Sequence, residues 1–375
     1  MSYKNENMKM IELHENGLDI RFRIRENGVV ELADFSSQEV KKAIMEPKED
    51  ICYPAVEIHR SGTGSLNMHA YKNNINQSSV DFVYENHELK EQDGGKELEI
   101  VMVSPEKLKA VYHMRLFDGV PAVQTWTEII NEGSEDQGLT YVSSFMYQGI
   151  SRGGEKPYYK KTDIYVPFNS WCCESQWQKY DAETLNLNGM VVDGFNHQGY
   201  GLNRYCYSGK GTWSTCEYLP MGIAEDRETG ETYIFQIESS GQWLAEYGSA
   251  QGGNLYLALS GATEQEHGWY KNLKPGESFT TVPAGAAVVK GGLNPAAAAL
   301  TRYRRKVRRP NTDDEKLNVV FNDYMNCLMG DPIESTEKEI IDKAAEMGCE
   351  YYCMDAGWYD KGYWWDRVGE WKESP

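Results

Sequence analysis

Two apolar segments near the end of the sequence, LNVVF at residues 317–321 and YYCMD at residues 351–355, decide which fold is predicted. Both have the composition of short buried strands. The residues between them, from Thr336 to Met347, carry apolar side chains at helical spacing. A strand–helix–strand unit of this size predicts a right-handed parallel crossover, the repeating unit of a TIM (β/α)8 barrel. A closed barrel needs eight such units, so we expect a truncated barrel that is incomplete at Pro375.

The segment between the two predicted strands carries the signals of helix ends. Thr336 and Glu339 fit a capping box at the start of the helix. Ala344 and Met347 share one face with the preceding apolar residues, and Gly348 fits the C-terminal cap. The helix is therefore expected to begin near Thr336 and to end at Met347.

The sequence from about residue 10 to residue 290 is predicted to be all-β. Short runs rich in Val, Ile, Tyr and Thr alternate with clusters of Gly, Pro, Asn and Asp, which favour turns. Several runs alternate apolar and polar residues, as half-buried antiparallel strands do. The predicted strands are residues 18–24, 80–84, 98–103, 111–116, 123–130, 232–239 and 255–259. So many strands predict a large sandwich of two stacked sheets.

A helix is expected between the sandwich and the barrel segment. Asn294 fits the N-cap and Pro295 the first helical position. The run at residues 302–309 carries six positive charges in eight residues. It could be a docking patch for an anion, or a linker helix whose charges are solvated or paired with acidic residues 313–315; the acidic background favours the linker. We therefore predict a sandwich domain at 1–293, a linker helix at 294–311 and the barrel start at 312–375.

Composition narrows the class of protein. Of the 375 residues, 38 are Lys or Arg and 57 are Asp or Glu, which gives a net charge of −19. Nucleic acids are bound by clustered positive charge, so they are excluded as partners. The chain has 10 Trp and 25 Tyr. These rings could stack on the C–H faces of sugars, or they could reflect the ordinary preference of strands for aromatic residues.

The sequence predicts no metal, no cofactor and no membrane span. Its eight cysteines include no C-x-x-C pair and no Cys/His cluster at zinc spacing. The N-terminus lacks an apolar signal segment, and no run of 18 apolar residues occurs. We therefore expect a reduced, cytoplasmic location.

Polar and aromatic residues follow both barrel strands, where the chemistry of such barrels is found. Asn322, Asp323 and Tyr324 follow the first strand, and Asp355 and Trp358 follow the second. Asp323 and Asp355 could form the closely spaced carboxylate pair of a retaining glycosidase, because adjacent strands lie about 4.8 Å apart. Alternating side-chain direction favours a turn or capping role for Asp323, and a binding role is favoured for Asp355.

The order of these motifs resembles the melibiase-type α-galactosidases of glycoside hydrolase family thirty-six. Near the C-terminus the resemblance lies in Phe321-Asn-Asp-Tyr, Tyr352-Cys-Met-Asp-Ala-Gly-Trp and Gly369-Glu-Trp. Upstream it lies in Asp118-Gly-Val-Pro-Ala-Val-Gln-Thr-Trp-Thr-Glu-Ile-Ile-Asn and in Leu273-Lys-Pro-Gly-Glu-Ser-Phe. It extends from about residue 20 to the end of the chain.

The resemblance implies an N-terminal β-supersandwich followed by a catalytic (β/α)8 barrel and a C-terminal β domain. It implies retaining hydrolysis of terminal α-galactosides in oligosaccharides, through a covalent glycosyl–aspartate and a second Asp as general acid/base. In the family both carboxylates come from later strands. No catalytic residue is therefore assigned, and the chain as given is expected to be inactive. The family also implies an oligosaccharide or glycoside as the binding partner and a homo-oligomer, often a tetramer.

What the resemblance assigns to this chain is sugar recognition. Asp355 matches the first Asp of the family's Asp-Asp-Gly-Trp motif, which accepts hydrogen bonds from a galactose hydroxyl. Trp358 matches the Trp of that motif, and Tyr324 matches an aromatic residue, commonly Trp, at the end of the first strand.

Two departures leave the specificity open. Ala356 stands where the family usually has a second, sugar-binding Asp, and Glu370 stands where Asp is usual. Loss of a buried hydrogen-bond partner can change discrimination by several kcal/mol. The alternatives are therefore a related specificity, for an N-acetylgalactosaminide or an arabinopyranoside, and a non-catalytic carbohydrate-binding module, which the aromatic content would suit.

Overall fold

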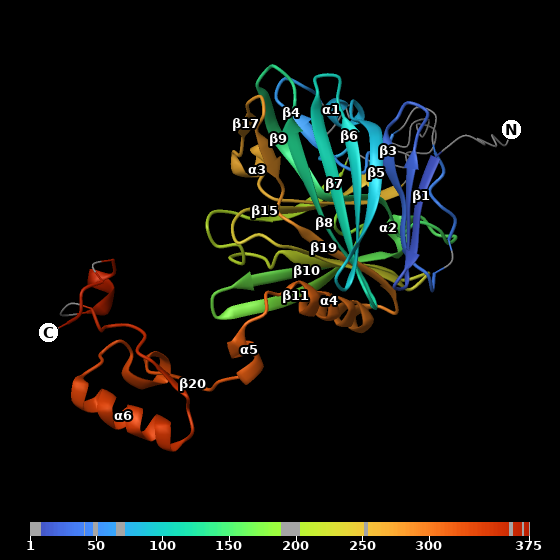
Figure 1. Cartoon of the computed structure of the whole chain (residues 1–375). Helices are drawn as coiled ribbons and strands as arrows, with labels where there is room; N and C mark the ends of the chain where they lie inside the picture. Colours follow the sequence, from blue (N-terminus) through green and yellow to red (C-terminus); the bar gives the residue numbers. More distant parts are fainter. Residues whose placement is uncertain are drawn as a thin grey trace. The chain divides into compact units, whose positions relative to one another are not determined.

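The computed structural model describes residues 9–40, 42–47, 52–64, 72–188, 203–250, 254–359, 363–369 and 371–374, and Glu370 lies outside them. The chain divides into two compact units, Met1–Val307 and Arg308–Pro375. In Figure 1 the first unit is a stack of β-sheets with few helices, and the described part of the second includes a long helix.

The first unit is built from antiparallel sheets. The ten-stranded sheet has the order β11-β10-β13-β14-β19-β8-β7-β6-β5, with β18 beside β8. Its strands are β5 (Val83–Gln92), β6 (Gly95–Val103), β7 (Leu108–Phe117), β8 (Val120–Asn131), β10 (Thr162–Ser170), β11 (Cys173–Asp181), β13 (Met221–Asp226), β14 (Glu231–Ile237), β18 (Ser278–Thr280) and β19 (Ala284–Lys290).

A six-stranded sheet has the order β12-β15-β16-β9-β17, with β4 beside β9, and a three-stranded sheet has the order β1-β2-β3. Their strands are β1 (Lys9–Glu15), β2 (Leu18–Ile24), β3 (Val30–Ser37), β4 (Ile58–Arg60), β9 (Gln137–Ile150), β12 (Arg204–Gly209), β15 (Trp243–Ala250), β16 (Asn254–Ser260) and β17 (Lys271–Leu273). In the described part of this unit, short helices lie between strands: α1 (Gln77–Val80), α2 (Tyr158–Lys161) and α3 (Glu264–His267).

The core lies between the sheets and accounts for much of the aromatic content. Alternation along β6 places Leu98 and Ile100 inside. Many large aromatic side chains are fully buried, including Trp243, Tyr112 and Tyr247. The tyrosine and tryptophan content of this unit therefore serves packing to a large extent, which is the second of the two interpretations that composition allowed.

The helix expected from residue 294 is α4 (Leu293–Val307), and it packs on the first unit. Its buried residues, among them Leu300 and Tyr303, contact the outer face of β8, β14 and β19. A Cβ at Gly285 would lie 2.5 Å from the Tyr303 ring, so the helix approaches the sheet closely there. The basic side chains of the helix are exposed, and Arg304 Nε donates to Gln236 Oε1 of β14 at 2.6 Å. The first compact unit therefore includes this helix and extends to Val307.

Most of the predicted strands of the sandwich are present, and one was wrong. Residues 18–24 match β2, and the runs beginning at 98, 111, 123, 232 and 255 fall on β6, β7, β8, β14 and β16. Residues 80–84 instead join the end of α1 to the start of β5. Asn76 caps α1 by accepting the backbone N–H of Ser78, and this local bond competes with extended backbone.

The second unit contains α5 (Thr312–Lys316), β20 (Val320–Asn322), an irregular turn at Tyr324–Leu328, α6 (Glu334–Glu346), β21 (Tyr351–Cys353) and a 3-10 turn at Trp364–Arg367. β20 and β21 pair in parallel, with Phe321 opposite Tyr352. The parallel strand–helix–strand unit is therefore confirmed, whereas its membership of a barrel stays a prediction.

The capping box of the long helix was predicted wrongly. α6 begins at Glu334, with Ile333 at the N-cap and no side-chain cap. Thr336 therefore lies inside the first turn. The C-terminal signal is confirmed, because Gly348 follows the helix with a φ of +90°. Met347, expected on the buried face, is 78% exposed.

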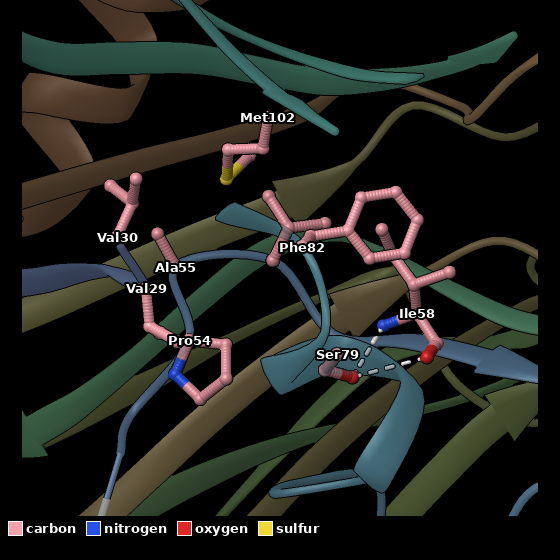
Figure 2. Close-up of a pocket in the computed structure, with 9 residues that line it drawn as sticks. Val29, Val30, Pro54, Ala55, Ile58, Ser79, Phe82 and Met102 are labelled. Carbon is pink, nitrogen blue, oxygen red and sulfur yellow. Dashed lines mark hydrogen bonds between the residues drawn. The ribbon is translucent and has the colours of Figure 1, made fainter. Parts of the chain in front are cut away.

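A crevice in the first unit belongs to the core. Figure 2 shows Pro54, Phe82 and other apolar side chains around it, with Ser79 hydrogen-bonded to Ile58 at one wall. The space inside is too small for water. Among the described residues, no helix is long and apolar enough to span a membrane.

Candidate functional site

The carboxyl ends of β20 and β21 bring together three of the polar residues singled out in the sequence. Asn322 ends β20, and its Nδ2 donates to Asp355 Oδ2 at 2.8 Å. The Oδ1 atom of the same amide accepts the backbone N–H of Tyr324 at 2.9 Å. Asn322 therefore fixes the exposed Asp355 carboxylate relative to the backbone at the end of the first strand.

Asp323 forms a hydrogen bond with the backbone at the end of β21. It is only 2% exposed, and its Oδ1 accepts the backbone N–H of Asp355 at 2.9 Å. A buried carboxylate engaged with a backbone donor is a capping group, as side-chain alternation favoured. The other oxygen, Oδ2, is also buried and out of reach of a substrate, so the structure does not support Asp323 and Asp355 as a catalytic pair.

Glu337 joins this network from α6 and was not found in the sequence. It is 3% exposed, and Tyr352 donates its hydroxyl to Glu337 Oε2. Burial raises the pKa of the Glu337 carboxyl; the Tyr352 hydrogen bond opposes the shift, and the adjacent Asp323 carboxyl adds to it. The Glu337 carboxyl therefore keeps its proton to a higher pH than an exposed glutamate does.

The aromatic candidates lie in two different ring groups. Tyr324 packs edge-on against Trp364, with centroids 5.6 Å apart. Trp358 stacks on Trp371 at 6.1 Å and meets Tyr359 edge-on at 5.1 Å. Both candidates remain partly exposed.

The turn after β21 depends on a glycine. Gly357 has a φ of +89°, and a Cβ there would lie 2.0 Å from the carbonyl oxygen of Gly330. The close approach of these two backbones sets the course of the chain between Asp355 and Trp358. The preceding residue, Ala356, is buried.

The arrangement places an oriented carboxylate and partly exposed aromatic rings after the same pair of strands. An oriented carboxylate can accept hydroxyl hydrogen bonds, and exposed aromatic faces can cover the C–H side of a pyranose. The residues of this edge belong to one unit and follow two adjacent parallel strands, where ligands of α/β folds bind.

Comparisons with known proteins point to one group of enzymes. No protein-family model matches the sequence. α-Galactosidase Mel36A of Lactobacillus acidophilus is 28% identical over 204 residues, which cover 51% of this chain and 27% of that protein. α-Galactosidase 1 of Pediococcus pentosaceus is 27% identical over 132 residues, covering 35% of this chain and 18% of that protein.

Solved structures share the fold. A variant of the GH36 α-galactosidase AgaA from Geobacillus stearothermophilus, in complex with raffinose, matches 94% of this chain with a TM-score of 0.72 and 16% identity. The α-galactosidase from Lactobacillus brevis matches 96% with a TM-score of 0.69 and 15% identity. The chain spans about half the length of these solved structures, 51% and 50%.

Proposed function

This chain resembles the N-terminal portion of GH36 α-galactosidases, and from that premise we propose that it takes part in the retaining hydrolysis of terminal α-galactosides in oligosaccharides. In this proposal it supplies the β-supersandwich and the first strand–helix–strand of the catalytic barrel. The observation that carries the proposal is the oriented, exposed Asp355 at the carboxyl ends of two parallel strands.

The proposed sugar contacts are Asp355, Trp358 and Tyr324. Because Asn322 holds one carboxylate oxygen of Asp355, the group is already oriented before substrate arrives, which lowers the entropic cost of binding. The neighbouring carboxylate at these strand ends, Asp323, is buried and caps the backbone. We therefore assign both catalytic carboxylates to residues other than those at this edge.

The first experiment compares two proteins on 4-nitrophenyl α-galactoside: this 375-residue chain and a version extended through its full reading frame. The extended protein is expected to turn over substrate and the 375-residue chain is not. Turnover by the 375-residue chain alone would show that the carboxylate assignment is wrong. Absence of activity in both, on galactosides, arabinopyranosides and N-acetylgalactosaminides alike, would overturn the proposed function.

Asp355→Asn in the active protein tests the sugar contact. Hydrogen bonds to a charged group are worth about 1.5–3 kcal/mol, so kcat/KM should fall roughly 10- to 100-fold. Glu91→Gln, at a carboxylate that is 79% exposed on the first unit, is the control and should leave kcat/KM unchanged.

Ala356 motivates the alternative specificity. Its side chain is buried next to Asp355 and provides no hydrogen bond where the family usually has Asp. A sugar that lacks or modifies the corresponding hydroxyl would lose no hydrogen bond at this position. Ala356→Asp is expected to shift preference toward galactose over arabinopyranose, as measured by the ratio of kcat/KM values.

A non-catalytic sugar-binding module is the second candidate. The observation that favours it is the exposure of aromatic side chains in the first unit, with Trp171 77% and Trp213 51% exposed. Isothermal titration of this chain with galactose and raffinose tests it. Saturable binding that Trp171→Ala or Trp213→Ala abolishes would support a binding module.

A further inference from the structure

A carboxylate–imidazole cluster lies on the outer face of the ten-stranded sheet, on strands unrelated to the proposed sugar contacts. Alternation along β6 directs Leu98 into the core and Glu97 and Glu99 to the opposite face. His113 of β7 lies directly across from Glu99 in the antiparallel register. Three side chains of ligand type are thereby brought to one point by strand pairing alone.

The three ligand atoms converge. His113 Nδ1 lies 2.9 Å from Glu97 Oε1 and 3.8 Å from Glu99 Oε1, and all three atoms fall within 4.8 Å of one another. Metal–ligand bonds of about 2.0–2.2 Å, at angles between square and tetrahedral, place neighbouring ligand atoms about 3.0–3.5 Å apart. The two observed distances bracket that range, so small side-chain rotations are enough to close the set around an ion.

The surroundings hold the ligands in orientation. Trp126 of β8 stacks on the His113 ring at 4.7 Å and 8°, which fixes the plane of the imidazole. Gln92 Nε2 donates to Glu97 Oε2 at 2.6 Å and leaves Oε1 directed at the imidazole. Orienting groups of this kind are a regular part of metal sites.

Charge also favours a cation. Two carboxylates on one face of a strand repel each other unless a positive charge lies between them. Among the described residues, Lys90 forms the ion pair with Glu99; its Nζ lies 2.5 Å from the carboxylate, and its side chain is 38% exposed. A half-exposed lysine can swing into solvent when a dication takes its place.

We propose that Glu97, Glu99 and His113 form a binding site for a divalent transition-metal ion, with Zn²⁺ the best match. An imidazole nitrogen selects against Mg²⁺ and Ca²⁺, and three protein ligands leave one position for water. The ion would join β6 to β7 on the outer face of the sheet and stabilise the sandwich. This site is independent of the proposed glycosidase function.

The test uses the whole chain with its accessible thiols alkylated by iodoacetamide, because exposed cysteines such as Cys172 and Cys216 would also bind the ion. Calorimetric titration with ZnCl2 and the visible absorption of added Co²⁺ report binding. We expect one ion for each chain and a higher unfolding temperature with the ion. His113→Ala and Glu99→Gln should each weaken binding at least tenfold.

The matched control is His14→Ala, at a histidine that pairs with a single carboxylate, Asp19, at 2.7 Å. It should leave the affinity and the thermal shift unchanged. Equal Zn²⁺ affinity in wild type and in both site variants would overturn the proposal, as would an absence of binding in wild type. Circular dichroism of each variant shows whether the sheets are intact, and Glu99→Gln keeps the test decisive if His113→Ala unfolds.

Discussion

The titration of Glu57 gives the sharpest test of the energetics of the first unit. Glu57 is fully buried, and burial raises the pKa of its carboxyl to about 7. The backbone N–H groups of Ile75 and Asn76 and the hydroxyl of Ser79 all donate to it. These bonds favour the charged form, so desolvation outweighs them; the Glu246 carboxyl adds to the upward shift.

The raised pKa of Glu57 determines how the free energy of unfolding changes with pH. The ordinary pKa of the carboxyl is 4.5, so the unfolded chain releases this proton before the folded one does. The contribution of Glu57 to stability is fully present below pH 4.5 and is lost as the pH rises through 7. Between pH 5 and pH 8 this group alone should lower the free energy of unfolding by roughly 2–3 kcal/mol.

Glu57→Gln removes the titration and keeps the shape. The variant loses some stability at every pH, because an amide N–H₂ meets backbone donors where a carboxylate oxygen stood. The difference in unfolding free energy between wild type and variant should nevertheless shift by roughly 2–3 kcal/mol in the variant's favour from pH 5 to pH 8. This difference is measured by urea unfolding, with pulsed hydrogen exchange and mass spectrometry on peptides of β4 and β9 as the readout. Glu91→Gln serves as the exposed control. The reasoning would be refuted if the difference in unfolding free energy between wild type and Glu57→Gln stayed constant from pH 5 to pH 8, to within about 0.5 kcal/mol.

Three further predictions follow from close contacts. Gly357→Ala places a Cβ against the carbonyl of Gly330 and should destabilise the β20–β21 pair by more than about 2 kcal/mol, seen as faster amide exchange there. Tyr303→Ala should cost the first unit about 3–5 kcal/mol in urea unfolding; a loss below about 1 kcal/mol would mean that α4 is not packed on the sheet. Asp323→Ala should speed exchange of the Asp355 amide at least tenfold, whereas Asp323→Asn keeps an acceptor oxygen and should retain most of the protection.

The strand β2 could be predicted from the sequence, whereas β15 and β19, which are buried on both faces, could not. β2 alternates apolar and charged residues, and the expected range matches its bounds. β15 has all eight residues buried, including Glu246, so alternation of polarity is absent. β19 is rich in Ala and Gly because α4 packs against its outer face. Without knowledge of that helix, a residue such as Gly285 favours a loop over a strand.

The strand-end residues of the candidate site were found because chain order alone places them at one edge of a parallel sheet. Glu337 was missed for a local reason. The capping-box pattern placed the helix start at Thr336, which would leave Glu337 in the first turn facing solvent. The helix begins two residues earlier, and Glu337 points to Tyr352 on the neighbouring strand. The partner of Glu337 lies on a strand distant in the sequence, and no pattern within the helix records that contact.

The two units differ in how well their strands are covered, and this bears on the proposed function. In the first unit, β7 and β8 each bury most of their residues. In the described part of the second unit, Val320 of β20 is 57% exposed and Tyr351 of β21 is 53% exposed. Parallel strands of this composition normally have cover on both faces, because unpaired edges and bare apolar faces invite association. The sequence of the pair is therefore suited to a larger sheet than these two strands make, which supports the proposal that they belong to a barrel whose other strands carry the catalytic carboxylates.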